Sequence, residues 1–190
     1  MIFGLKNVPF ELITLLNDDE ETPIRMISAK MCPILEKEDG SYMAESLDII
    51  SYIDGLEKYG DAIVGPSLNN DNLNQWLQDA RNYHYRLAMP RWPKMDLEEF
   101  KTKSAQAYFT RKKEEAIGPF SEALEKTPEY LKLGNDHLEV LENLFVGEGP
   151  FFAGAKLSID DFHLFAALRC LTTAKEVKFP PKVNRYINHI

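Results

Sequence analysis

Apolar and turn-forming residues alternate over short distances in the first 56 residues of the chain. The run Phe10–Leu16 is rich in strand-forming side chains and predicts a buried β-strand. Two further segments, Pro33–Glu36 and Ser41–Met43, flank the turn residues Glu38-Asp39-Gly40 and predict a β-hairpin. The pattern therefore predicts a small sheet in this part of the chain.

Helical signals lie between and around these predicted strands. Residues 1–7 are typical of the last turns of a helix, which Pro9 ends. Thr22 and Pro23 predict the start of a short helix, and Ser46 is the expected N-cap of a longer one. The order helix, strand, helix, hairpin, helix indicates an α/β unit.

The rest of the chain is predicted to be helical. Residues 59–68 contain Gly60, Gly65 and Pro66 and have the composition of a linker. Apolar residues at helical spacing then predict helices over 73–87, 105–116, 131–145, 159–171 and 183–190. We expect an α/β domain over residues 1–58, a linker over 59–68 and an all-helical domain over 69–190.

The segment Ser158-Ile-Asp-Asp161 precedes the most apolar of these helices. It has the spacing of a capping box, with Asp in place of the usual Glu. Asp160 and Asp161 are neighbours on the helix and point in different directions, which argues against a paired acid and base. We therefore expect a structural role for this segment.

Composition narrows the classes of partner. The chain has 190 residues, of which 44% are hydrophobic and 27% charged, as in ordinary globular proteins. Its net charge of −8 would repel nucleic acid and anionic membranes, so we expect neither as a partner. We see no membrane-spanning or secretory pattern, and two cysteines are too few for a secreted disulfide framework. We expect a cytoplasmic monomer, and no metal because the four histidines lack ligand spacing.

Two features near the predicted hairpin could bind a ligand. Pro33 begins a strand, where proline removes a hydrogen-bond donor and restricts the residue before it. If the Cys32–Pro33 bond is cis, the backbone of Cys32 can pair with an extended peptide, although a trans proline at a strand edge is the commoner case. Glu45 and Ser46 stand at the head of a helix, where the hydroxyl and free amides suit a carboxylate and Glu45 suits an ammonium group. A plain N-cap is the alternative interpretation.

These features together resemble the glutathione-transferase superfold and, within it, the type-two glutaredoxins. The segments that carry the resemblance are Met1–Asn7, Leu15–Asp19, Glu21–Pro23, Pro33–Leu35, Tyr42–Met43, Glu45–Ser46 and Asp48–Ile49. The resemblance implies a thioredoxin-like α/β domain followed by an all-α domain. It also implies that Pro33 is a cis-proline, that Glu45 and Ser46 bind the γ-glutamyl end of glutathione, and that Lys30 contacts a carboxylate of the ligand. The predicted glutathione site is thus Lys30, Cys32, Pro33, Glu45 and Ser46.

The sequence departs from this family at its redox centre. The family has a Cys-Pro-Tyr-Cys motif at the start of the first helix, after a first strand, and neither is found in this sequence. We therefore expect no catalytic residue in residues 1–190, and we interpret Met1 as an internal methionine of a longer chain. The missing strand would lie between Phe10–Leu16 and Pro33–Glu36, where each unpaired buried backbone group costs about 1–3 kcal/mol. The α/β domain is expected to be incomplete.

The two cysteines of the chain have different expected roles. Cys32 could form a mixed disulfide with bound glutathione, but we favour a small side chain that fills space. Cys170 lies on the predicted buried helix and is expected to be inert.

Three functions remain open at this point. The leading hypothesis is a glutathione-dependent thiol–disulfide oxidoreductase that acts on glutathionylated or disulfide-bearing proteins. The alternatives are a non-catalytic glutathione-binding or interaction module and a conventional glutathione transferase. The matching segments favour the glutaredoxin branch.

Overall fold

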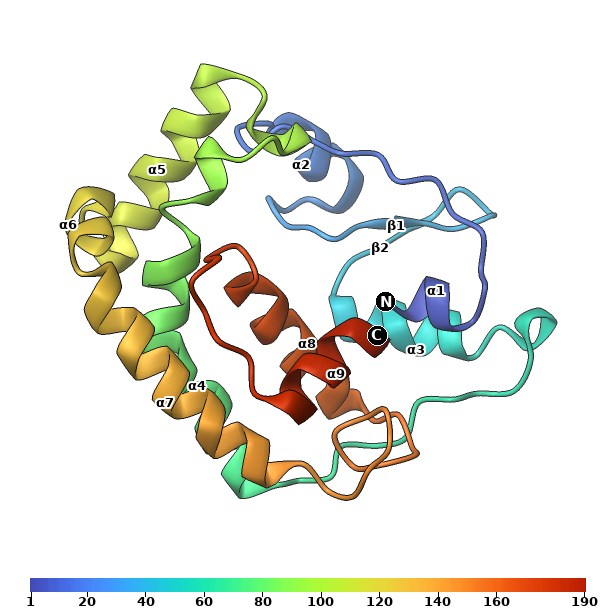
Figure 1. The fold of residues 1–190 in the computed structure, drawn as a ribbon. Helices are drawn as coiled ribbons and strands as arrows, with labels where there is room; N and C mark the ends of the chain where they lie inside the picture. The colour runs from blue at the N-terminus through green and yellow to red at the C-terminus, as the bar shows by residue number, and fades with distance from the viewer.

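The first part of the chain folds as a short hairpin with three helices, as the computed structural model of residues 1–190 shows (Figure 1). The helices are α1 (Ile2–Leu5), α2 (Glu21–Ile27) and α3 (Ser46–Asp54), and the strands are β1 (Leu35–Glu36) and β2 (Tyr42–Met43). The strands pair antiparallel, with Leu35 opposite Met43. Gly40 has a φ of 79°, which glycine adopts without steric cost, and this allows the tight turn between the strands. The predicted hairpin and helices are confirmed.

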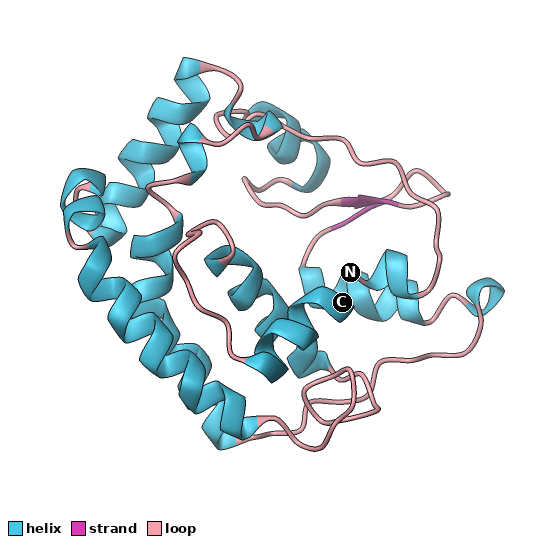
Figure 2. Cartoon of the chain, viewed as in Figure 1, coloured by secondary structure: helices cyan, strands magenta, loops and turns pink.

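The predicted strand Phe10–Leu16 is wrong. Residues 8–16 have no regular structure, and no backbone–backbone hydrogen bond involves residues 10–15. A strand is stable only when its backbone groups pair with a neighbour, and β1 and β2 pair only with each other. The apolar side chains therefore stay in water, with Leu12 79% and Ile13 72% exposed. Figure 2 shows this stretch as a long loop leading from α1 to α2.

A small apolar core joins the two parts of the chain. Ile49, Ile50 and Ile53 lie on one face of α3 and pack with Ile2 of α1. Phe162 of the helical part belongs to the same buried cluster. The α/β part therefore has no core that is entirely its own.

The remaining residues form a helical bundle. Its helices are α4 (Asp71–Ala88), α5 (Lys103–Ile117), α6 (Phe120–Glu125), α7 (Thr127–Leu144), α8 (Ile159–Leu171) and α9 (Pro181–His189), with 3₁₀ turns at Glu57–Tyr59, Trp92–Lys94 and Glu98–Phe100. The long helices α4 and α7 lie side by side, with α8 packed against α4 (Figure 1). Gly134 of α7 is needed at this contact, because a Cβ there would come within 3.1 Å of the Tyr83 ring. The short helix α6 was not predicted, whereas the other five helices were.

The start of α8 is fixed by Asp161, as the capping-box spacing predicted. Its carboxylate accepts hydrogen bonds from the backbone N–H of Ser158 at 2.8 Å, the Ser158 hydroxyl at 2.9 Å and the N–H of Phe152 at 2.8 Å. The side chain is completely buried. Asp161 therefore satisfies donors that burial would otherwise leave without a partner.

The segment between the two parts is held from both sides. On the first side, the buried Lys6 ammonium donates to the carbonyl oxygens of Asp54, Gly60 and Asp61. The Asp54 carboxylate, 3.7 Å from that ammonium, accepts the N–H groups of Ile63 and Val64.

On the second side, the next residues of the segment, 65–68, are hydrogen-bonded to the helical part. The N–H of Gly65 donates to the Leu157 carbonyl, and the Asp160 carboxylate accepts the Ser67 hydroxyl and the Leu68 N–H. Asp160 thus has a structural role, as does Asp161.

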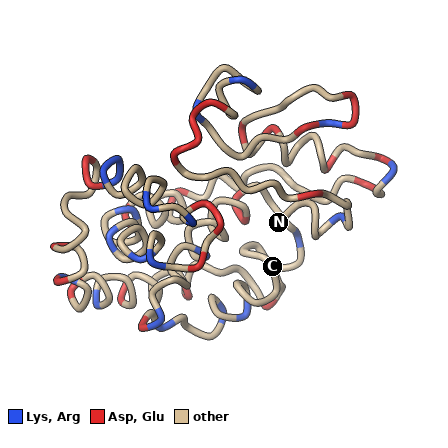
Figure 3. Tube along the Cα trace, turned by 90° about the horizontal axis from the view of Figure 1, so that it is seen from above, with Lys and Arg blue, Asp and Glu red and all other residues tan.

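Lys and Arg positions and Asp and Glu positions both occur along the two parts of the chain (Figure 3). None of the helices combines the length and the apolar character needed to cross a lipid bilayer.

Candidate functional site

The hairpin brings two of the predicted site segments to one end of the first part. Cys32 and Pro33 lie just before β1, and Glu45 and Ser46 lie just after β2, so the pairing of Leu35 with Met43 brings both segments to the same end of the hairpin. The Cys32–Pro33 bond is cis, as the family resemblance implied. All four residues are exposed. Segments that are 12 residues apart in the sequence are therefore both exposed at this end of the hairpin.

The head of α3 differs from the simple N-cap that was predicted. Ser46 is the first helical residue, and Glu45 occupies the N-cap position without a side-chain capping bond. Neither the Glu45 carboxylate nor the Ser46 hydroxyl makes a hydrogen bond within the protein. The first-turn amides of a helix have no intrahelical acceptor, so donors and a carboxylate are all available here.

Glu45 also has an uncommon backbone conformation, with φ at 68° and ψ at 114°. Left-handed conformations are costly for residues other than glycine and persist where surrounding structure requires them, often at binding sites. Glu45 is exposed and directly precedes Ser46, the first residue of α3.

Lys30 lies between α2 and the hairpin. Its ammonium donates to the carbonyl oxygens of Asn17 at 2.8 Å and Asp19 at 2.5 Å. The same ammonium lies 5.2 Å from the ring centroid of Tyr108, a residue of α5 in the helical part. Tyr108 was not among the predicted site residues, and its sequence surroundings carry no motif that marks it.

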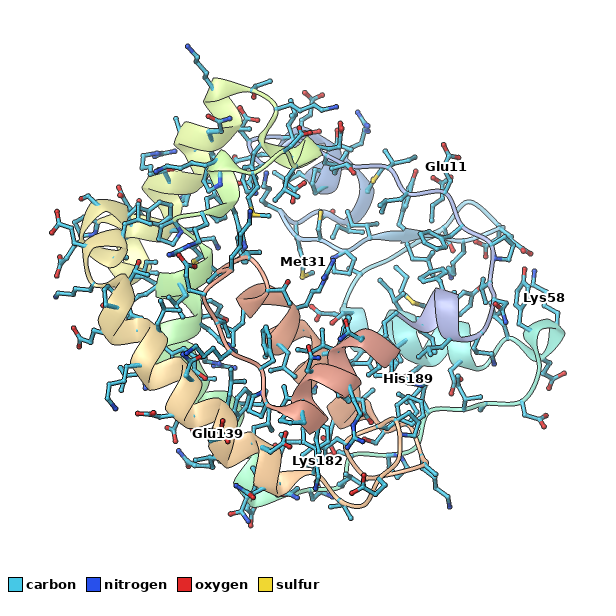
Figure 4. All side chains as sticks on the ribbon, in the orientation of Figure 1. Glu11, Met31, Lys58, Glu139, Lys182 and His189 are labelled. Carbon is cyan, nitrogen blue, oxygen red and sulfur yellow. The ribbon has the colours of Figure 1, made fainter.

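The turn that carries Lys30 and Pro33 faces the helical part. Figure 1 shows this turn and the start of α3 on the side of the hairpin nearest α8, and Figure 4 labels Met31 in this region. The two parts of the chain thus both border the candidate site.

The two cysteines have different surroundings. Cys32 is exposed and Cys170 is half-buried on α8, and both are free thiols. Burial raises the pKa of the Cys170 thiol and so favours its protonated form, and the expectation that this cysteine is inert stays a prediction.

A second cluster of titratable groups lies in the helical core, away from the hairpin. The Tyr83 hydroxyl is 3.0 Å from His137 Nδ1, and the Trp76 indole N–H donates to the His137 carbonyl at 2.8 Å. His84 is 4% exposed, and its Nε2 has no hydrogen-bond partner. Burial, together with the nearby His137, lowers the pKa of His84 to about 4. Every other polar side-chain atom with this degree of burial has a partner.

Comparison with known proteins decides the family. A sequence profile described as "Glutaredoxin 2, C terminal domain" matches residues 72–190, and one described as "Glutathione S-transferase, N-terminal domain" matches residues 1–61. Glutaredoxin 2 of Escherichia coli K12 is 40% identical over 186 residues, which are 98% of this chain and 84% of that protein. The chain belongs to the glutaredoxin 2 family.

Solved structures agree with this family. The crystal structure of glutaredoxin 2 from Salmonella typhimurium in complex with glutathione is 42% identical, with a TM-score of 0.92 over 99% of this chain and 84% of that one. A glutathione S-transferase from Xanthobacter autotrophicus is 18% identical with a TM-score of 0.52, which shows the fold alone. The predicted fold class, a thioredoxin-like part followed by an all-helical part of the glutathione-transferase type, is confirmed.

Proposed function

We propose that this member of the glutaredoxin 2 family binds glutathione at the end of its hairpin and serves glutathione-dependent thiol–disulfide exchange. The observation that carries the proposal is the close structural match to a glutaredoxin 2 that was solved with glutathione. The free carboxylate, hydroxyl and amides at the head of α3 supply groups of the right kind for this ligand. The predicted site residues Lys30, Cys32, Pro33, Glu45 and Ser46 are our proposed glutathione contacts.

Glutathione has an ammonium and a carboxylate at its γ-glutamyl end and a second carboxylate on its glycine. The first-turn amides of α3 and the Ser46 hydroxyl would bind the γ-glutamyl carboxylate, and Glu45 would accept from the ammonium. Cys32 and Pro33 lie at the same end of the hairpin as these residues, and their peptide would flank the middle of the ligand. Lys30 would bind the glycine carboxylate.

The redox step itself transfers a disulfide. A thiolate attacks one sulfur of a protein–glutathione mixed disulfide, a new disulfide forms, and the other sulfur leaves as a thiolate that takes up a proton. Helix N-termini stabilise such thiolates, but Cys32 lies outside any helix and Cys170 lies near the C-terminal end of α8. We therefore assign no catalytic residue within residues 1–190. This placement favours a non-catalytic glutathione-binding module as the second candidate function.

Three further assignments belong to the proposal. Its partners would be glutathionylated or disulfide-bearing proteins, and it would act as a cytoplasmic monomer. The domain division would be residues 1–58, 59–68 and 69–190.

Calorimetric titration with reduced glutathione tests the site. Ser46→Ala and Glu45→Gln should each weaken binding by roughly 10- to 150-fold, which corresponds to the loss of one hydrogen bond to a charged group. Ser51→Ala is the matched control, because Ser51 lies on the same helix and its hydroxyl bonds to the Leu47 carbonyl instead. Equal affinities of all four proteins would contradict the assignment.

An activity assay separates the two candidate functions. The chain is mixed with a glutathione–cysteine mixed disulfide and reduced glutathione, which supplies the attacking thiol, and the release of cysteine with formation of glutathione disulfide is compared with the reaction without protein. Binding without release supports the non-catalytic module, whereas turnover supports the oxidoreductase.

A further inference from the structure

Lys30 is a cation without an acidic partner, although three acidic residues lie nearby in the sequence. Asp18, Asp19 and Glu20 precede α2, yet no carboxylate oxygen comes within 4.0 Å of the Lys30 ammonium. The ammonium is held only by the carbonyl oxygens of Asn17 and Asp19. An ammonium group has three donors, so one donor and the full positive charge remain for a ligand.

Two of the three carboxylates are engaged elsewhere. The Asp19 carboxylate accepts the N–H of Thr22 at 2.9 Å, in the first turn of α2. The Glu20 carboxylate accepts the hydroxyl of Tyr108, which comes from α5. Hydrogen bonds to the charged form of a carboxylate compete directly with pairing to a lysine.

Tyr108 therefore contacts both members of a potential ion pair. Its hydroxyl binds Glu20, and its ring lies 5.2 Å from the Lys30 ammonium, within the range of a cation–π contact. The Arg111 guanidinium lies 5.7 Å from the same ring. A backbone bond of 2.9 Å from the Asn17 N–H to the Glu99 carbonyl fixes the two parts of the chain beside this contact.

We propose that Tyr108 is a positioning residue that keeps Glu20 away from Lys30, so that the lysine stays free to bind a carboxylate of the ligand. The inference rests on the proposed function, because it takes glutathione as the source of that carboxylate. Through Tyr108, the helical part of the chain would raise the affinity for the ligand, although Tyr108 itself need not contact the ligand. Without the Tyr108 hydroxyl, the Glu20 carboxylate is released and competes for Lys30.

Calorimetric titration of the full chain with glutathione tests the inference through a rescue. Tyr108→Phe keeps the ring but removes the hydroxyl, and it should weaken binding roughly two- to fivefold, the size of one exposed ion pair. Adding Glu20→Gln removes the competing charge and should restore the affinity. In a Lys30→Met background, Tyr108→Phe should have no further effect.

Two controls keep the test specific. Tyr85→Phe removes the hydroxyl of an exposed tyrosine on α4 and should leave binding unchanged. The glycine monoethyl ester of glutathione lacks the carboxylate assigned to Lys30, so its affinity should not respond to Tyr108→Phe.

The outcomes are distinguishable. If the unmodified chain binds no glutathione, the proposed function fails and the inference fails with it. If it binds and Tyr108→Phe is as tight as the parent, or Glu20→Gln does not restore the weakened affinity, the inference alone is overturned. A loss that Glu20→Gln cannot repair would show that Tyr108 only supports the local fold.

Discussion

Replacing Asp161 by alanine tests whether the start of α8 depends on a single buried carboxylate. The substitution leaves the N–H groups of Ser158 and Phe152 and the Ser158 hydroxyl without their acceptor. The position is completely buried, so water cannot replace the carboxylate without local opening.

The expected cost follows from these contacts. An unsatisfied buried donor costs about 1–3 kcal/mol, and the hydroxyl can rotate toward another acceptor whereas the two backbone donors cannot. The free energy of unfolding should therefore fall by about 4 kcal/mol in Asp161→Ala. For a chain of this length that corresponds to a lower Tm by about 8–16 °C. Asp161→Asn keeps one acceptor oxygen and should lose about half as much.

Thermal and urea unfolding, followed by circular dichroism, provide the measurement. Asp136→Ala is the control, because this exposed carboxylate pairs only with Lys132 one turn away and should change stability by less than about 0.5 kcal/mol. If Asp161→Ala were as stable as Asp136→Ala, the reasoning that assigns the start of α8 to this carboxylate would be refuted.

Two further predictions concern buried charge. Lys6→Met leaves the buried Asp54 carboxylate without its cation and should lower the free energy of unfolding, measured in urea titrations, by about 3–5 kcal/mol. Lys58→Met removes the cation of an exposed pair and should change the free energy of unfolding little. His84 has a pKa of about 4 when folded and near 6.5 when unfolded, so below pH 6.5 the unfolded chain binds a proton that the folded chain does not. The stability contributed by neutral His84 is therefore complete above pH 6.5 and falls by about 2 kcal/mol by pH 5. Tm measurements above pH 6.5 and at pH 5 check this. The loss of stability at pH 5 that is due to His84 should be absent in His84→Phe.

The sequence was sufficient where structure depends on residues close together in the chain. The turn at Gly40 and the capping arrangement of Ser158 and Asp161 involve contacts over four positions or fewer, and both formed as predicted. Phe10–Leu16 failed because strand propensity does not supply the partner on which a strand depends. The helix Phe120–Glu125 was missed because six residues are too few to show a helical period.

In the candidate site, too, features set by nearby residues could be predicted, and a contact between distant residues could not. The family resemblance led to the cis bond before Pro33, and the hairpin brings this residue to the same end as Glu45. The contact between Tyr108 and Glu20 spans 88 positions and joins α5 to the N-cap residue of α2, from different parts of the chain. No local pattern encodes such a contact, because the packing of the two parts creates it.

The segment that joins the two parts leaves almost no free length for a hinge. Residues 60–64 are held by Lys6 and Asp54, and residues 65–68 are held by Leu157 and Asp160. Opening the molecule like a clamshell would have to separate the shared apolar core around Ile50 and Phe162. Because Cys32, Pro33, Glu45 and Ser46 are exposed, a ligand can reach the end of the hairpin without such an opening.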